Sequence, residues 1–166
     1  MNVLIKLAMI SEELDKNDFV LESNKVMHTM VKLSQKENDT CPTATQDIKV
    51  NLKNRQKAID DHGYGPADPS QPNNKFWKQK MDMWKVDELS EVKNMLCGNC
   101  AAFDVTTKTL DCIAKGIGDD EGTEDPFDVI EAGQLGYCRF LKFKCAAART
   151  CDAWVVGGPI TDDKAV

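Results

Sequence analysis

The spacing of its cysteines constrains this chain more than any other feature of the sequence. Six of the seven cysteines fall between residues 97 and 151, and the chain has only two histidines. Cys97 and Cys100 are two residues apart, which puts both sulfurs on one tight turn so that they can meet one metal centre; Gly98 and Asn99 supply its permissive backbone. The cysteines that follow are Cys112, Cys138, Cys145 and Cys151. This pattern predicts a metal or redox site.

The length and composition are those of one ordinary domain. The chain has 166 residues, of which 42% are hydrophobic and 29% charged, so it can bury a core. The apolar residues at its start have no basic segment before them and run straight into Ser11 and Glu12, which predicts an amphipathic helix rather than an export signal. We therefore expect a cytoplasmic protein in a reducing compartment, where clustered cysteines hold metal more often than they form disulfides.

The distribution of charge excludes two classes of partner. The net charge is −6, and residues 96–166 carry 7 basic and 12 acidic residues. A nucleic-acid-binding protein needs a basic stripe to neutralise phosphates, and an anionic membrane surface attracts basic residues for the same reason. No segment reaches the roughly 18–20 apolar residues that span a bilayer. We therefore expect neither nucleic acid nor membrane as a partner.

Hydrophobic periodicity divides the chain into a helical region, residues 1–95, and a metal-binding region, residues 96–166. In the second region the helical pattern is weak, and we expect an exposed acidic loop over residues 116–128 and a short strand over residues 154–156. The predicted fold class is α plus irregular, with a small loop-rich, few-stranded cysteine domain. About five helices are predicted in the first region: residues 3–14, 21–33, about 44–61 with a capping box of Thr43 and Gln46, a helix that Asn73 or Asn74 caps and that reaches Trp84 after a proline-rich connector, and a short helix that Asp87 caps.

Four thiolates satisfy either tetrahedral zinc or a cubane iron–sulfur cluster. Aromatic residues lie close in sequence to the later cysteines, and shielding from water is what an iron–sulfur cluster needs to tune its potential. The neighbours are Phe103, Tyr137, Phe140, Phe143 and Trp154. They favour iron–sulfur, with zinc as the alternative.

The remaining cysteines and two arginines have simpler interpretations. Cys41 stands alone before a proline and is predicted to be a free thiol. Cys112 and Cys145 are either buried small hydrophobic residues or replacements for one of the other ligands. Arg139 and Arg149, which flank two of the cysteines, are expected to pair with the acidic loop or to offset the charge of a cluster.

Three segments carry a resemblance to a known family. Residues 97–103, CGNCAAF, are similar to the first ligand motif of high-potential iron–sulfur proteins; residues 136–143, GYCRFLKF, resemble the segment of their third ligand, and residues 151–154, CDAW, their last. The resemblance implies that Cys97, Cys100, Cys138 and Cys151 hold one [4Fe–4S] cluster in a fold of that type. The whole chain also resembles uncharacterised small proteins of marine tailed phages, through residues 64–66 and 97–103, which implies the host cytoplasm.

The resemblance implies a small one-cluster carrier of single electrons, and the acidic surface would dock a basic redox protein. The alternative is an interaction or virion-associated protein that binds a virion or host protein and uses its metal, iron–sulfur or zinc, only as a structural staple. A redox enzyme with an open iron site is a third hypothesis. The sequence contains no Ser-His-Asp order, P-loop or dinucleotide-binding glycine pattern, so we expect electron transfer or binding rather than catalysis.

Overall fold

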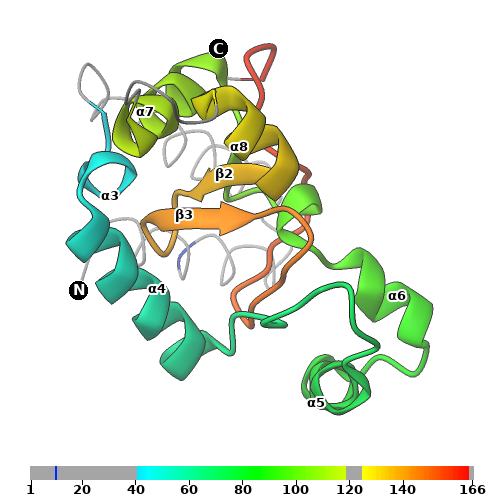
Figure 1. Ribbon diagram of the computed structural model, residues 1–166. Coiled ribbons are helices and arrows are strands. Elements are labelled where there is room, and N and C mark those ends of the chain that lie inside the picture. The colour runs from blue at the N-terminus through cyan, green and yellow to red at the C-terminus, as the bar shows by residue number, and fades with distance from the viewer. Residues whose placement is uncertain (1–9, 11–40, 119–124, 165–166) are drawn as a thin grey trace. The chain divides into compact units, whose positions relative to one another are not determined.

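The computed structural model describes residue 10 and residues 41–118 and 125–164, and residues 41–166 belong to one compact unit (Figure 1). The helices predicted over residues 3–14 and 21–33 lie outside the described part, and the predicted boundary at residues 95 and 96 stays a prediction. The elements are the helices α3 Thr43–Gln46, α4 Ile48–His62, α5 Asn74–Trp84, α6 Leu89–Asn94, α7 Thr107–Ile117 and α8 Pro126–Gly133, the 3-10 turn η1 Cys97–Asn99, and the strands β1 Phe103–Asp104, β2 Leu135–Cys138 and β3 Phe143–Ala146.

The helix predicted over residues 44–61 is in fact two helices, α3 and α4. Asp47 separates them because its backbone is extended, with φ −92° and ψ 107°. Its side chain accepts hydrogen bonds from the N–H groups of Lys49 at 2.8 Å and Val50 at 3.1 Å, so it caps α4. The predicted capping box is wrong, since α3 follows Pro42 with no side-chain cap.

α5 and α6 lie close to their predicted positions, whereas α7 and α8 were not predicted. The acidic segment expected to be a loop over residues 116–128 instead contains the end of α7 and the start of α8. Thr106 caps α7 by accepting from the N–H of Thr109 at 3.3 Å. Asp125 caps α8, whose first residue is Pro126. Proline suits this position because the first helical N–H has no partner within the helix.

The three strands form one antiparallel sheet in the order β1-β2-β3. Phe103 lies opposite Cys138, and Gly136 lies opposite Cys145. Successive side chains of a strand point to opposite faces, so Gly136 and Cys138 share one face of β2 while Leu135 and Tyr137 share the other. The strand predicted over residues 154–156 is wrong, because no strand includes these residues.

The two faces of the sheet meet different cores. One face packs against α4 and the η1 turn, with Ala58 and Phe143 buried there. The other face meets α3, α7 and α8, with Ile113, Ile130 and Tyr137 buried between them. Figure 1 shows α4 beside β3 and α8 beside β2. The predicted combination of helices with few strands is confirmed, and no helix in the described ranges has the length and apolar character needed to cross a membrane.

Candidate functional site

Five cysteines meet in the core on the α4 side of the sheet. Cys97, Cys100, Cys145 and Cys151 are buried, and the half-buried Cys138 packs against them. They come from the η1 turn and the residue after it, from the end of β2, from β3, and from the loop that follows β3. We call the buried cluster that these five cysteines form with their neighbours the cysteine core. It contains all four predicted ligands, together with Cys145.

Backbone hydrogen bonds hold the first two cysteines against the segment before the last one. The N–H of Cys97 donates to the carbonyl oxygen of Arg149 at 2.6 Å, and the N–H of Gly98 donates to that of Ala147 at 3.0 Å. Thr150 and Gly65 exchange two backbone hydrogen bonds, at 2.7 and 3.0 Å. The CxxC turn and the connector after α4 are thus fixed to the chain that leads into the last predicted ligand.

The side chains of this core differ from those of an ordinary protein interior. Its buried residues include no Leu, Ile, Val or Met, although such residues usually dominate a core. Ile59, Val105 and Leu141 pack only at its edge and are partly buried. The centre therefore consists of thiols, small residues and aromatic rings. The buried set is Ala58, Tyr64, Cys97, Cys100, Ala102, Phe103, Phe143, Cys145 and Cys151.

The aromatic shield is only partly the predicted one. Phe103 and Phe143 are buried in the cysteine core, and Trp154 packs against it. Tyr137 lies in the other core, because it alternates with Cys138 along β2 and so points to the opposite face. Phe140 leaves 47% of its surface exposed. The prediction that Tyr137 and Phe140 shield the cysteines is wrong.

Tyr64 is buried in the cysteine core, where Tyr137 and Phe140 were expected. The predictions from sequence do not include it. Its ring stands edge-on to Phe143, with 4.9 Å between the centroids, and its hydroxyl oxygen accepts from the N–H of Ala146 at 3.1 Å. Burial raises the pKa of Tyr64, so the phenol stays neutral. Tyr64 precedes the first cysteine of the core by more than thirty residues, and no local pattern connects them.

Backbone N–H groups point at the sulfurs of two predicted ligands. The Sγ of Cys100 accepts from Ala102 at 3.5 Å and from Val155 at 3.4 Å. The Sγ of Cys138 accepts from the N–H of Leu141 at 3.3 Å. Such bonds stabilise a thiolate, and in iron–sulfur proteins they contribute to setting the reduction potential.

The acidities of the cysteines differ across the core. Burial raises the pKa of Cys100, and burial together with nearby cysteines raises the pKa of Cys151 to about 12. The S–H of Cys145 donates to Cys138, which lowers the pKa of Cys138 and raises that of Cys145. Cys97 also hydrogen-bonds to Cys145 and interacts electrostatically with Cys100 and Cys151. In the metal-free chain Cys138 is thus a stronger acid than Cys145.

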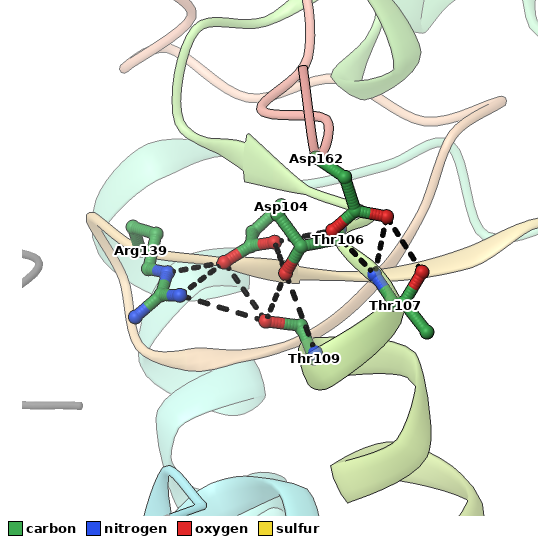
Figure 2. Close-up of polar contacts among 6 residues, drawn as sticks. All are labelled: Asp104, Thr106, Thr107, Thr109, Arg139 and Asp162. Carbon is green, nitrogen blue, oxygen red and sulfur yellow. Dashed lines mark hydrogen bonds and ion pairs between the residues drawn. The ribbon is translucent and has the colours of Figure 1, made fainter. Parts of the chain in front are cut away.

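A buried ion pair anchors the residue after Cys138. Arg139 pairs with Asp104, whose side chain is 0% exposed, and the N–H of Arg139 donates to the carbonyl oxygen of Ala102 at 2.9 Å. Figure 2 shows the guanidinium on one side of Asp104, with the hydroxyls of Thr106 and Thr109 also turned to its carboxylate. The ion pair joins the chain that follows Cys100 to the chain that follows Cys138. Residues 119–124 of the acidic loop lie outside the described part of the chain, so the expected pairing of Arg139 with that loop stays a prediction.

A second, partly buried ion pair anchors the residue after Cys151. The side chain of Lys80, on α5, is 5% exposed and pairs with Asp152, and it also donates to the carbonyl oxygen of Gly63 at 2.9 Å. The Lys80 ammonium lies 5.1 Å from the centre of the Phe76 ring. Two of the predicted ligands are therefore each followed by a charged residue that is tied to a distant segment.

The two cysteines outside the core form a disulfide. Cys41, just before α3, is bonded to Cys112 on α7, across a sequence separation of 71 residues. The prediction of a free thiol at Cys41 is wrong, because α3 packs against α7 and brings the two sulfurs together. Cys112 is thereby excluded as a replacement ligand.

The described ranges contain no group of three or more His, Cys, Asp or Glu side chains arranged so that it could hold a metal ion. The thiols of the cysteine core thus lie in one cluster but are not arranged around a site for a single metal ion.

The chain was also compared with known proteins. It matches no protein-family model, and neither a curated protein nor a solved structure proved similar to it. Any conclusion about function therefore depends on the residues of the site themselves.

Proposed function

We propose that the cysteine core binds one [4Fe–4S] cluster through Cys97, Cys100, Cys138 and Cys151, and that the protein carries single electrons, as its resemblance to high-potential iron–sulfur proteins implies. The observation that carries the proposal is the convergence of five non-disulfide cysteines from separate segments in one buried core. When bound, such a cluster gains or loses one electron at a time, at a potential set by its surroundings.

The donors of the core fit this group. Thiolates are the usual protein ligands of iron–sulfur clusters, and the N–H groups of Ala102, Val155 and Leu141 are placed to stabilise negative charge on sulfur. A cubane cluster is larger than a single ion, and its ligands stand farther apart. A centre made of thiols, small residues and aromatic rings gives such a group a dry surrounding with few branched aliphatic side chains.

Four of the five cysteines are preferred as ligands. The pKa of Cys151 is raised in part by the proximity of Cys97, Cys100 and Cys138, so these four sulfurs form one interacting set. Cys145 also interacts with Cys97 and Cys138, so proximity alone does not separate it from these four. The choice follows the family resemblance, which matches its ligand segments to Cys97, Cys100, Cys138 and Cys151 and leaves Cys145 as a neighbour of the cluster.

The two ion pairs support the same assignment. Arg139 and Asp152 follow the third and fourth proposed ligands, and each is tied to a distant segment, by Asp104 and by Lys80. A cluster needs its ligands held in a fixed arrangement, and partners outside the first layer of ligands provide this in metal sites.

The test is to purify the chain without oxygen and to measure its visible spectrum together with its iron, sulfide and zinc content. We expect a brown protein with about four irons and four sulfides per chain, as the cluster formula requires. Reversible one-electron voltammetry would support the carrier, whereas a cluster with no accessible couple would favour the structural staple. A colourless protein with one zinc would overturn the proposal.

Cysteine variants test the ligand set. Replacing Cys97, Cys100, Cys138 or Cys151 singly by serine should remove most of the iron. Cys145→Ser is the matched control, because it makes the same substitution in the same core and should retain the iron. Loss of iron from this control would show that the ligand set is wrong.

A further inference from the structure

An open apolar groove lies on the surface beside the cysteine core. Its volume is about 380 Å³. One face of α8 lines it with Phe127, Ile130 and Glu131, and α7 contributes Leu110. Phe127 leaves 49% of its surface exposed there, so the groove offers an aromatic ring to a partner.

The groove reaches the wall of the cysteine core. Phe103 and Ala147 line the groove, and the same two residues belong to the core or pack against it. The Phe103 ring fits there because Gly136 has no side chain; a Cβ at that position would stand 2.5 Å from the ring. A molecule seated in the groove would thus be separated from the thiols by a single layer of side chains.

The surroundings of the groove are acidic. Glu131 is the charged residue among those that line it, and Asp128 is exposed one turn earlier on α8. The described residues of this region, 107–118 and 125–134, carry 2 basic and 4 acidic residues, for a net charge of −2.

From this placement we propose that the groove is the docking site of a basic electron-transfer protein, which inserts an apolar side chain beside Phe127 and places lysines or arginines around Asp128 and Glu131. The inference rests on the proposed function, because it needs a redox centre behind Phe103. An apolar centre within a charged rim is the usual anatomy of a transient interface. Complementary charge raises the rate of encounter more than it raises affinity.

Two other exposed apolar residues near proposed ligands provide rivals within the same molecule. Phe140 is 47% exposed and follows Cys138 by two residues, and Val155 is 39% exposed with its N–H on the Sγ of Cys100. Phe140 is not among the residues that line the groove. Phe127 and Phe140 can therefore be compared directly. Both are phenylalanines with nearly the same exposure, and of the two Phe127 alone lines the groove.

The experiment measures the rate of electron exchange between the cluster-loaded full chain and cytochrome c, a basic electron-transfer protein used as the probe. Charge reversal with Asp128→Lys and Glu131→Lys together should slow exchange about tenfold at low ionic strength and much less at 1 M salt, where charges are screened beyond roughly 3 Å. Glu88→Lys with Glu91→Lys is the matched control, since it reverses two exposed carboxylates three residues apart, one just before α6 and one on it. It should change the rate less than twofold.

The apolar part is tested with Phe127→Ala, which should slow exchange roughly fivefold at every salt concentration, while Phe140→Ala leaves the rate unchanged. The opposite result, or equal effects of the two charge reversals, would overturn the proposal. Dimerisation abolished by Phe127→Ala would also overturn it, by assigning the groove to a second copy of the chain. Iron content, measured first, separates the outcomes: a chain without cluster refutes the proposed function, whereas a loaded chain with unchanged rates refutes the docking site alone.

Discussion

Replacing Asp104 tests most directly whether buried polar contacts stabilise this fold. Its carboxylate is 0% exposed and accepts from the N–H of Thr106 at 2.9 Å, from the hydroxyl of Thr106 at 2.8 Å and from that of Thr109 at 2.9 Å, besides its ion pair with Arg139. Asp104→Ala removes the acceptor and leaves these donors unsatisfied in the interior. Removing one partner of a buried ion pair costs about 3–5 kcal/mol.

The exposed end of the same network provides the control. Asp162 accepts from the N–H of Thr107 at 3.1 Å and from its hydroxyl at 2.6 Å, but its own side chain is open to water (Figure 2). Water can replace a lost acceptor there, so Asp162→Ala should cost only about 0.5–1.5 kcal/mol.

Urea unfolding followed by tryptophan fluorescence and by circular dichroism measures both losses. A stability of roughly 5–15 kcal/mol is typical of a domain, so the loss at Asp104 would be a large fraction of the total. The chain should unfold at a much lower urea concentration with Asp104→Ala than with Asp162→Ala. Equal losses for the two variants would refute the argument that burial makes this carboxylate important.

Three further changes have expected outcomes. Gly136→Ala should lower the free energy of unfolding by about 1–3 kcal/mol through overpacking against Phe103, and unchanged urea unfolding would contradict the packing described for that ring. Cys41→Ser should cost roughly 2–4 kcal/mol, because it opens the loop that Cys112 closes, and chemical reduction of the wild-type chain should reproduce the loss. The pKa of Cys151 is raised to about 12 in the folded state, against roughly 8.5 when unfolded, so its contribution to stability is complete below about pH 8.5 and declines as the pH rises toward 12. Alkaline unfolding of the cluster-free chain should accordingly be less steep in Cys151→Ala, and an equal slope would disprove this assignment.

Helices with strong local signals were predictable from the sequence. α5 combines aromatic residues at helical spacing with a preceding proline-rich connector, and it ends at Trp84, the last residue of the predicted helix. Asn73 precedes it, but the predicted side-chain cap is wrong, because this side chain makes no capping hydrogen bond. α8 also had a usable signal, because Asp125 and Pro126 are favourable at the cap and first position of a helix. The glycines and acidic residues around this signal favour a loop, and they obscure it in the sequence.

The sequence identified the cysteines of the site but not the packing around them. All four proposed ligands lie in the cysteine core. They could be predicted because the CxxC turn and the later cysteines can be read directly from the sequence. The shield was missed in part because proximity in sequence does not determine which face of a strand a residue occupies, as Tyr137 shows. The partners Lys80 and Tyr64 come from segments brought in by tertiary contacts, for which one sequence holds no signal.

The single strand β2 serves as the common wall of two different interiors. Its four residues send Cys138 and Gly136 to one side, and Tyr137 and Leu135 to the other. Inserting or deleting one residue within Leu135–Cys138 would exchange these assignments, since the side chains of a strand alternate with a period of two. Length changes in this strand are therefore tolerable only in pairs, and an odd change would place a tyrosine among the thiols and a thiol between α7 and α8.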